Sequence, residues 1–300
     1  MTYSRFLELF PDNDACLEDL RGKFFPDGSE CPGCGKTTKF FRIKSRAAYS
    51  CMYCRHQVYP TAGTIFHKST VSLQLWYFAI YLMSSTRCGI SAKQLEREIG
   101  VTYKTAHRMF KQIRTLMGDE EDGPLSGDVE VDETWSGGRI RAGDSARGAQ
   151  YVSAKMSRRP TVLGMVERGG RVRARVIGGR ASSDIRPMMR EHVLPSSMIF
   201  TDEFRPYDGS AREYRGHKRI KHEARVYVDG DTHTNTVEGF FGLFKNGVRG
   251  VYHSVSAAYL QTYLDEYSFR YNRRHSAEPL FYAILNRVQK PALASLPPGL

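Results

Sequence analysis

Residues 127–138 read Gly-Asp-Val-Glu-Val-Asp-Glu-Thr-Trp-Ser-Gly-Gly, a short alternating segment that carries acidic side chains up to a pair of glycines. The alternation predicts a strand in which the valines face one side and Glu130 and Asp132 face the other. A strand that directs acids to one side suggests a metal site, although a solvated edge strand has the same pattern. The segment therefore indicates a metal site only if other parts of the chain supply further acidic residues.

Two further segments supply such partners. Residues 196–202 end an apolar run in Asp202, and residues 234–245 place Glu238 in an amphipathic helical pattern. The expected catalytic constellation is Asp132, Asp202 and Glu238. Three convergent carboxylates can bind two divalent ions about 3.5–4 Å apart, one activating an attacking oxygen and one stabilising a leaving oxygen. Mg²⁺ or Mn²⁺, two per active site, are the expected cofactors, because a hard ion binds a few carboxylates and keeps positions for phosphate oxygens.

The neighbours of these acids have different expected roles. Glu133 and Glu203 each follow a candidate aspartate directly, so on a strand their side chains point away from the metals. Lys245 lies seven residues after Glu238, two helical turns along the same face, and Arg249 lies four residues further. Both cations are expected to bind a DNA backbone, although ordinary solvated cations on a helix remain the alternative.

Composition indicates a globular chain with a polyanionic partner. Its 300 residues leave room for two or three domains, and 41% of them are hydrophobic. The formal net charge of +12 favours binding to nucleic acid. Residues 139–180 contain eleven Lys or Arg and two acids, whereas residues 118–133 contain eight acids and no Lys or Arg. This asymmetry suggests a phosphate-facing surface beside the acidic strand.

The sequence predicts a soluble, cytoplasmic protein associated with the nucleoid and not with a membrane. Its most apolar stretch, residues 73–83, is too short to span a bilayer. No basic and then apolar N-terminal segment precedes a small-residue cleavage site, so export is not expected. Four of the six cysteines form two Cys-x-x-Cys pairs, which fits metal binding in a reducing compartment better than disulfides.

These two pairs are separated by sixteen residues that include two strand-like runs, at 39–43 and 47–50. Two tight turns that each present two thiolates are typical of a zinc ribbon, with a closed shell of four sulfurs around a structural Zn²⁺. Unrelated buried or redox-active cysteines are the alternative. His56 is expected at the surface, and Cys16 and Cys88 are expected to be ordinary thiols. The predicted zinc ligands are Cys31, Cys34, Cys51 and Cys54.

Between the ribbon and the acidic strand, the pattern predicts three helices, over residues 71–86, 91–99 and 102–117. Ser91 and Thr102 are good N-cap residues. The last two helices fit a helix-turn-helix whose second helix reaches base edges and phosphates, although a hairpin used only for packing has the same pattern. The residues expected on its outward, DNA-binding face are Tyr103, Lys104, Thr105, His107, Arg108 and Lys111.

The chain after residue 127 predicts a mixed α/β domain. Its expected strands are the alternating stretch at 127–138, then 161–167, 171–177, 198–202 and 224–228, and its expected helices are 182–192, 234–248 and 255–272. This order is that of a ribonuclease H-like fold, in which the first and fourth strands are neighbours and would bring Asp132 to Asp202. The predicted domains are 1–68 with the zinc ribbon, 69–118 with the helix-turn-helix, an acidic linker at 119–127, the catalytic domain at 128–290 and a tail at 291–300.

Taken together, the chain resembles a bacterial insertion-sequence transposase with an N-terminal zinc ribbon and a DDE catalytic domain, over about residues 20–280. The matching segments are Cys31-Pro-Gly-Cys34, Cys51-Met-Tyr-Cys54, Thr61-Ala-Gly-Thr-Ile-Phe66, Val129-Glu-Val-Asp132-Glu133, Thr201-Asp202, His233-Thr-Asn-Thr-Val-Glu238, Lys245, Tyr252-His253 and Tyr271-Asn-Arg-Arg274.

The resemblance implies a recombinase that binds the terminal inverted repeats of its element, cuts there and joins the ends to target DNA. Water would attack first and the freed 3′-hydroxyl second. It also implies a homo-oligomer, a dimer or larger, on double-stranded DNA. Two other functions stay open: a domesticated or inactive DNA-binding protein derived from such a transposase, and a nuclease of RNA hybrids or junctions. Terminal inverted repeats in the flanking DNA would favour the transposase.

Overall fold

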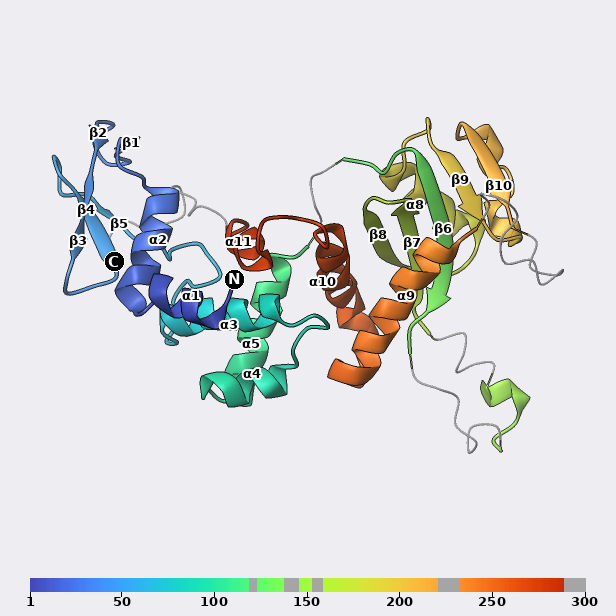
Figure 1. Cartoon of the computed structure of the whole chain (residues 1–300), viewed down its shortest axis with the longest axis horizontal. Helices are drawn as coiled ribbons and strands as arrows, with labels where there is room; N and C mark the ends of the chain where they lie inside the picture. Colours follow the sequence, from blue (N-terminus) through green and yellow to red (C-terminus); the bar gives the residue numbers. More distant parts are fainter. Residues whose placement is uncertain (119–122, 138–145, 153–158, 221–232, 289–300) are drawn as a thin grey trace. The chain divides into compact units, whose positions relative to one another are not determined.

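The computed structural model describes residues 1–118, 123–137, 146–152, 159–220 and 233–288 (Figure 1). The chain divides into two units, residues 1–116 with 277–300 and residues 117–276. The sequence pattern grouped residues 128–290 together, whereas the structure assigns those after 276 to the first unit. The reason is aromatic packing, since Phe281 of α11 (Leu280–Leu285) lies against Phe6, Phe10 and Tyr77.

The first unit begins with two capped helices and a small antiparallel sheet. Helices α1 (Tyr3–Leu9) and α2 (Asn13–Phe24) have Thr2 and Asp12 as N-caps, and each cap side chain accepts a backbone hydrogen bond three residues on. The sheet has the order β3-β4-β5, and β1 pairs with β2 in a separate hairpin. Their bounds are β1 Ser29–Glu30, β2 Thr37–Thr38, β3 Phe40–Ile43, β4 Ala48–Cys51 and β5 Gln57–Val58.

Three helices complete this unit, and all three were predicted to within three residues at each end. They are α3 (Leu73–Ser85), α4 (Ala92–Ile99) and α5 (Tyr103–Thr115). The caps explain the accuracy: Ser91 Oγ accepts from Gln94 N at 3.1 Å, and Thr102 Oγ1 accepts from Thr105 N at 3.4 Å. Gly100 ends α4 in the left-handed region (φ +69°), which glycine adopts without a steric penalty.

The second unit is built on a five-stranded mixed sheet in the order β10-β9-β6-β7-β8. Strand β6 pairs antiparallel with β7 and parallel with β9, β7 pairs antiparallel with β8, and β9 pairs parallel with β10. The prediction that the first and fourth strands are neighbours is therefore confirmed. The bounds are β6 Asp128–Trp135, β7 Thr161–Glu167, β8 Val172–Ile177, β9 Met198–Thr201 and β10 Gly216–Arg219.

Helices cover both faces of this sheet (Figure 1). Helix α8 (Ser182–His192) packs Ile185 and Met189 onto the face that carries Val129 and Val131. Helices α9 (Asn235–Gly247) and α10 (Leu260–Asn272) cover the opposite face, which Val162 and other strand residues provide. The acids on the far side of β6 from its valines therefore face α9.

Two expectations in this unit differ from the structure or lie outside it. The expected strand at 224–228 and the start of the expected linker, 119–122, lie outside the described residues. The fifth strand is β10, formed by Gly-His-Lys-Arg at 216–219, whose half-exposed edge position gives no apolar alternation to recognise.

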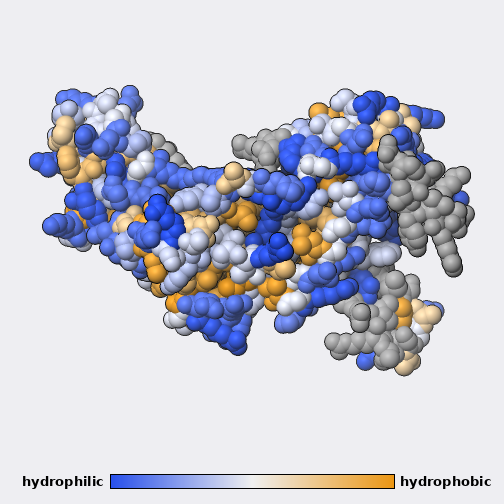
Figure 2. Space-filling view, in the orientation of Figure 1, coloured by the Kyte–Doolittle hydropathy of each residue, from blue (hydrophilic) through white to orange (hydrophobic). Residues whose placement is uncertain are grey.

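Figure 2 shows one face of the molecule, on which hydrophilic residues predominate and hydrophobic ones lie between them. No helix among the described residues has the length and hydropathy needed to cross a bilayer.

Candidate active site and zinc centre

The sheet brings Asp132 and Asp202 level with each other. Parallel pairing aligns Asp128 with Met198 and Glu130 with Phe200, and the same offset places Asp132 beside Asp202, the residue after the end of β9. Each carboxylate is oriented by a backbone donor. Asp132 Oδ1 accepts from Glu133 N at 2.8 Å, and Asp202 Oδ1 accepts from Phe204 N at 3.0 Å.

Helix α9 brings Glu238 over the same end of the sheet. Glu238 lies in the first turn of α9, and its Oε1 accepts from Thr234 Oγ1 at 3.1 Å. The helix approaches the sheet closely because Gly164 is the partner of Asp132 on β7. A Cβ atom at Gly164 would lie 2.7 Å from Cζ of Phe241 on α9, so this approach requires glycine.

The pKa of Asp132 reflects its burial and the acidic residues around it. Burial, followed by the charges of Glu133, Asp202 and Glu238, raises the pKa of Asp132 to about 7. The charges of Asp202 and Glu238 thus disfavour the ionised form of Asp132, and a divalent cation beside Asp132 would offset this effect. Among the described residues, however, only the four ribbon thiolates gather three or more possible ligand atoms within 4.8 Å of one another.

Lys245 lies beside this acidic group, as the helical spacing predicted. Its Nζ donates to Thr134 Oγ1, on the same side of β6 as Asp132. Burial and the charge of Arg249 lower the pKa of Lys245, whereas the charge of Asp132 raises it. Arg249 itself is exposed in the segment after α9. A cation therefore stands close to the carboxylates on the helix that carries Glu238.

Glu130 is a functional residue whose individual role the sequence analysis missed. Its side chain is fully buried, and Oε2 accepts from the backbone N–H groups of Thr236 at 2.8 Å and Val237 at 3.1 Å. Arg168 Nε donates to Oε1 at 2.9 Å. Thr234, the N-cap of α9, makes no side-chain capping bond, so Glu130 caps this helix from the sheet. The signal was present, since Glu130 precedes Asp132 by two residues and shares its side of the strand.

We expect Glu130→Gln to destabilise the protein by about 2–4 kcal/mol, because it leaves the partly buried Arg168 and two helix N–H groups without their anionic partner. Urea unfolding of the full chain measures this. The matched control is Asp128→Asn on the same strand, whose 3.3 Å contact to Arg215 is solvent-exposed and should be worth about 0.5 kcal/mol or less. Equal urea midpoints for Glu130→Gln and Asp128→Asn would contradict the role of Glu130 in capping α9.

Glu133 lies where the strand alternation predicted, on the other side of β6 from Asp132, whereas Glu203 follows β9 and lies on no strand. Glu133 is buried on the α8 face, where Arg180 Nε donates to it at 2.8 Å and Tyr207 Oη also donates to it. Glu203 is exposed. Neither side chain is placed as a ligand beside Asp132 and Asp202.

The phosphate-facing surface expected from residues 139–180 needs correction for its described part. Several of its arginines form ion pairs within the unit and are largely buried, because acids distant in sequence meet them in the fold. The pairs are Arg168 with Glu130, Arg171 with Glu167, Arg175 with Asp265 and Arg180 with Glu133. The positive run in the sequence is thus partly neutralised by structure, and residues 138–145 and 153–158 lie outside the described chain.

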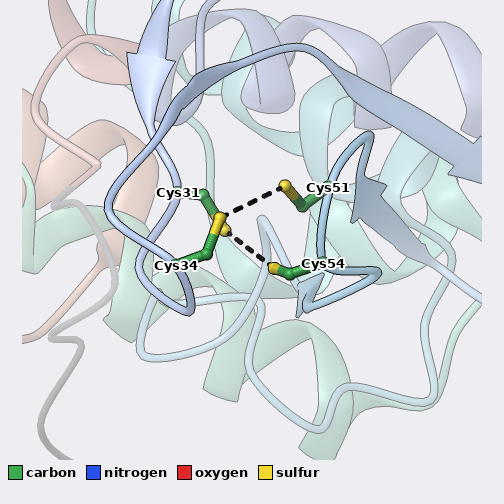
Figure 3. A group of neighbouring side chains, drawn as sticks. All are labelled: Cys31, Cys34, Cys51 and Cys54. Atoms are coloured by element: carbon green, nitrogen blue, oxygen red, sulfur yellow. Dashed lines mark hydrogen bonds between the residues drawn. The ribbon is translucent and has the colours of Figure 1, made fainter.

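The four ribbon cysteines form a cluster of the size that zinc requires (Figure 3). The Sγ atoms of Cys31 and Cys54 are 3.6 Å apart, and those of Cys34 and Cys51 are 3.9 Å apart. A regular tetrahedron with Zn–S bonds of about 2.3 Å has sulfurs about 3.8 Å apart. The cluster therefore fits structural Zn²⁺, as predicted.

The two cysteine turns have matching backbone geometry. Gly33 N donates to Cys31 Sγ at 3.3 Å, and Tyr53 N donates to Cys51 Sγ at 3.4 Å. His56 packs against Gly33, where an added Cβ would lie 2.6 Å from the imidazole Cγ. His56 is exposed and is not one of the clustered ligands.

The residues predicted to contact DNA from α5 lie on one side of that helix. Its other side is buried through Ala106, Met109 and Ile113. Arg108 makes only long hydrogen bonds, at 3.4 Å to Gln112 Oε1 and 3.4 Å to Ser69 Oγ. The predicted residues are exposed (Tyr103, Lys104, Arg108 and Lys111) or half-buried (Thr105 and His107).

Two family models match separate parts of the chain. Residues 124–272 match an ISXO2-like transposase domain, and residues 11–57 match a transposase zinc-ribbon domain. A Halobacterium salinarum protein, described as an uncharacterized protein in transposable element ISH50, is 29% identical over 267 residues, covering 81% of this chain and 85% of the relative. An uncharacterized transposase-like protein of Haemophilus influenzae is 27% identical over 97 residues, covering 32% of this chain and 77% of the relative. No solved structure matches.

Proposed function

Because the chain belongs to the insertion-sequence transposases that carry an N-terminal zinc ribbon, we propose that it binds the ends of its element and catalyses metal-dependent DNA cleavage and strand transfer. The observation that carries the proposal is the parallel register of β6 and β9, which, continued by two residues, aligns Asp132 within β6 with Asp202 just after the end of β9. Glu238 is near enough to contribute to the raised pKa of Asp132. These three residues are the proposed catalytic triad.

The fold supports a ribonuclease H-like assignment for the second unit. Its first three strands form an antiparallel meander, and its fourth strand, β9, returns to pair parallel with the first, β6. The resemblance implies this neighbour relation. It matters for catalysis because it sets two aspartates from distant parts of the sequence side by side.

Asp132, Asp202 and Glu238 would hold Mg²⁺ or Mn²⁺, a choice supported by the charges of Asp202 and Glu238 at Asp132, which favour a cation there. Two such ions would supply activation of the attacking oxygen and charge neutralisation at the leaving oxygen. The chain itself supplies orientation. Glu130 fixes the N-terminus of α9 and hence the helix that carries Glu238, while the Lys245 ammonium is placed to contact a phosphate oxygen beside Asp132.

Helices α4 and α5 are proposed to form a DNA-binding helix-turn-helix. Helix α5 buries one side and presents Lys104 and Arg108 on the other, which a helix entering a major groove requires. The ribbon and these helices would bind element ends, and the second unit would perform the chemistry. We further expect the protein to act on DNA as a homo-oligomer, a dimer or larger.

We expect Arg108→Ala and Lys104→Ala to weaken binding to the element's end more than to random DNA, because each base-reading contact carries about 1–3 kcal/mol of discrimination. Binding titrations on both DNAs at one salt concentration measure the difference. Arg5→Ala on α1 is the control, since its guanidinium is exposed, already paired with Glu8 and outside α4 and α5. Equal losses on both DNAs would show that Arg108 and Lys104 contact phosphates only.

The proposed activity is tested with end-labelled duplex taken from the DNA that flanks the gene. Full-length protein with Mg²⁺ or Mn²⁺ should cut it at the element boundary and join the cut end to a second DNA. A protein that binds this duplex with specificity but never cuts it, with either metal, would instead be a DNA-binding derivative of a transposase.

A further inference from the structure

The ribbon sheet β3-β4-β5 packs one of its two faces on α2. The ring centroid of Phe40 lies 5.7 Å from that of Phe25, and Tyr49 Oη donates to Glu18 Oε2 at 2.7 Å. Because side chains alternate along each strand, the neighbours of Phe40 and Tyr49 point to the other face. The strand register places five residues there, which we call the open ribbon face: Lys39, Phe41, Ser50, Met52 and Gln57.

Two large apolar side chains stand in solvent on the open ribbon face. Phe41 is 52% exposed and Met52 is 42% exposed. Phe41 pairs with Ser50, and Met52 continues the ladder by donating its N–H to Lys39 O at 3.2 Å. Phe41 and Met52 are therefore diagonal neighbours, about 7–8 Å apart. Single exposed hydrophobic residues are common, but these two together form a surface that a flat apolar ligand can cover.

The charge around this surface is positive. Residues 31–95 contain nine Lys or Arg and no Asp or Glu. Lys39 directly precedes β3, and Arg46 reaches the face from the hairpin, since its Nη1 donates to Gln57 Oε1 at 3.3 Å. Asp27 approaches Lys39 only at 3.9 Å, in a contact where both side chains are exposed. The open ribbon face therefore complements a polyanion.

The width of the face favours an unpaired DNA strand over a duplex. Neighbouring strands lie about 4.8 Å apart, so three strands span about 10 Å between their outer axes, and side chains add to this width. The major groove is about 12 Å wide and admits a helix or a two-stranded ribbon. An exposed phenylalanine gains little from the phosphates outside the groove. An unpaired base can stack on it, because every base has a π face.

We propose that the open ribbon face binds single-stranded DNA, with a base stacked on Phe41 and backbone phosphates at Lys39 and Arg46. An aromatic platform beside cations is the composition that binds unpaired strands without sequence preference. The inference rests on the proposed function for the source of the strand, because cutting at the element boundary would supply unpaired nucleotides there. Within the element end, it gives the ribbon the unpaired strand and leaves the duplex to α5.

The test is a fluorescence-anisotropy titration of the full chain with a labelled oligodeoxythymidine of about 15 nucleotides, a length that small single-strand sites cover. Phe41→Ala should weaken binding about 5- to 150-fold, as loss of one stacked base implies. Phe41→Tyr should retain most of the affinity. Tyr3→Ala is the matched control, because Tyr3 is equally exposed (53%) but lies on α1. Unchanged affinity in Phe41→Ala would overturn the proposal.

The salt dependence of binding tests the cations. For single strands, the slope of log affinity against log salt is about −0.7 per phosphate contact, so Lys39→Ala should reduce its magnitude by about 0.7. Phe41→Ala should leave the slope unchanged. An unchanged slope in Lys39→Ala would also overturn the proposal. Metal analysis shows whether the ribbon of each variant is folded. If Phe41→Ala has lost its zinc, the slope of Lys39→Ala decides.

The same variants on element-end duplex separate this site from general DNA contact. Phe41→Ala should bind the duplex nearly as well as the wild type does, and an equal loss on both DNAs would overturn the proposal. So would dissociation of an oligomer by Phe41→Ala with single-strand binding intact, because the face would then join two copies. A wild type that binds the oligodeoxythymidine through Phe41 but never cuts would defeat the proposed function alone. One that cuts but binds this strand no better than Phe41→Ala would defeat this inference alone.

Discussion

Asp132→Asn, Asp202→Asn and Glu238→Gln are each expected to abolish strand cleavage and joining while leaving binding to end DNA nearly intact. An amide keeps the shape of each side chain but removes the negative charge that holds a divalent ion at the phosphate. Binding should survive because it is assigned to the ribbon and to α5, which contain none of these acids. A cleavage assay with Mg²⁺ or Mn²⁺, beside a gel shift on the same duplex, measures both.

The control is Glu203→Gln, which removes an exposed acid directly after Asp202 and should retain most activity. Glu133→Gln is a poorer control than the sequence suggested, because Glu133 is buried against Arg180 and Tyr207. Cleavage by any triad variant at close to the wild-type rate would show that the triad is assigned wrongly.

The stability of the Asp132→Asn variant should also show that its loss of activity is not caused by unfolding. Without metal, burial and nearby carboxylates raise the pKa of Asp132 from 3.8 to about 7. Its contribution to stability is therefore present below the unfolded pKa of 3.8 and is lost as the pH rises through about 7. Asparagine has no such loss. In EDTA, the urea midpoint of the variant should thus rise relative to that of the wild type as the pH increases from about 4 to about 7, and the difference should stay constant above that.

Removal of zinc is the second large effect expected. Purified protein should contain about one zinc per chain, and Cys34→Ser or Cys54→Ser should lose it, because four thiolates complete the shell and structural zinc contributes about 10–16 kcal/mol of binding energy to folding. Metal analysis together with thermal unfolding measures both consequences. Cys88→Ser is the control, since Cys88 is exposed and lies outside the cluster. Full zinc retention by Cys34→Ser would exclude the predicted site.

Features that depend on local sequence were predictable. Helices α4 and α5 start at Ser91 and Thr102 because these side chains satisfy free N–H groups within three residues. The two-residue period of β6 correctly separated Asp132 from Glu133. The succession of strands and helices correctly predicted that the first and fourth strands are neighbours. The cysteine spacing likewise predicted the cluster.

Features that depend on long-range pairing were not predictable from local patterns. Arg168 and Arg180 were expected at a DNA surface, yet their partners Glu130 and Glu133 lie more than thirty residues earlier in the chain. The docking of α11 on the first unit rests on aromatic contacts to residues near the N-terminus. Strand β10 is an exposed edge, so no buried alternation marks it. In the first two cases the residue that fixes the structure is distant in sequence, and in the third the strand carries no apolar pattern.

The most direct test of the account is strand joining by wild-type protein with a pre-cut element end. Two labelled duplexes are compared in Mg²⁺, one ending in a 3′-hydroxyl and one in a 3′-deoxy nucleotide, each with the same target DNA. The account predicts joined product from the 3′-hydroxyl end alone, and none when Asp202→Asn replaces the wild type. Joined product from the 3′-deoxy end, or equal joining by Asp202→Asn, would contradict it.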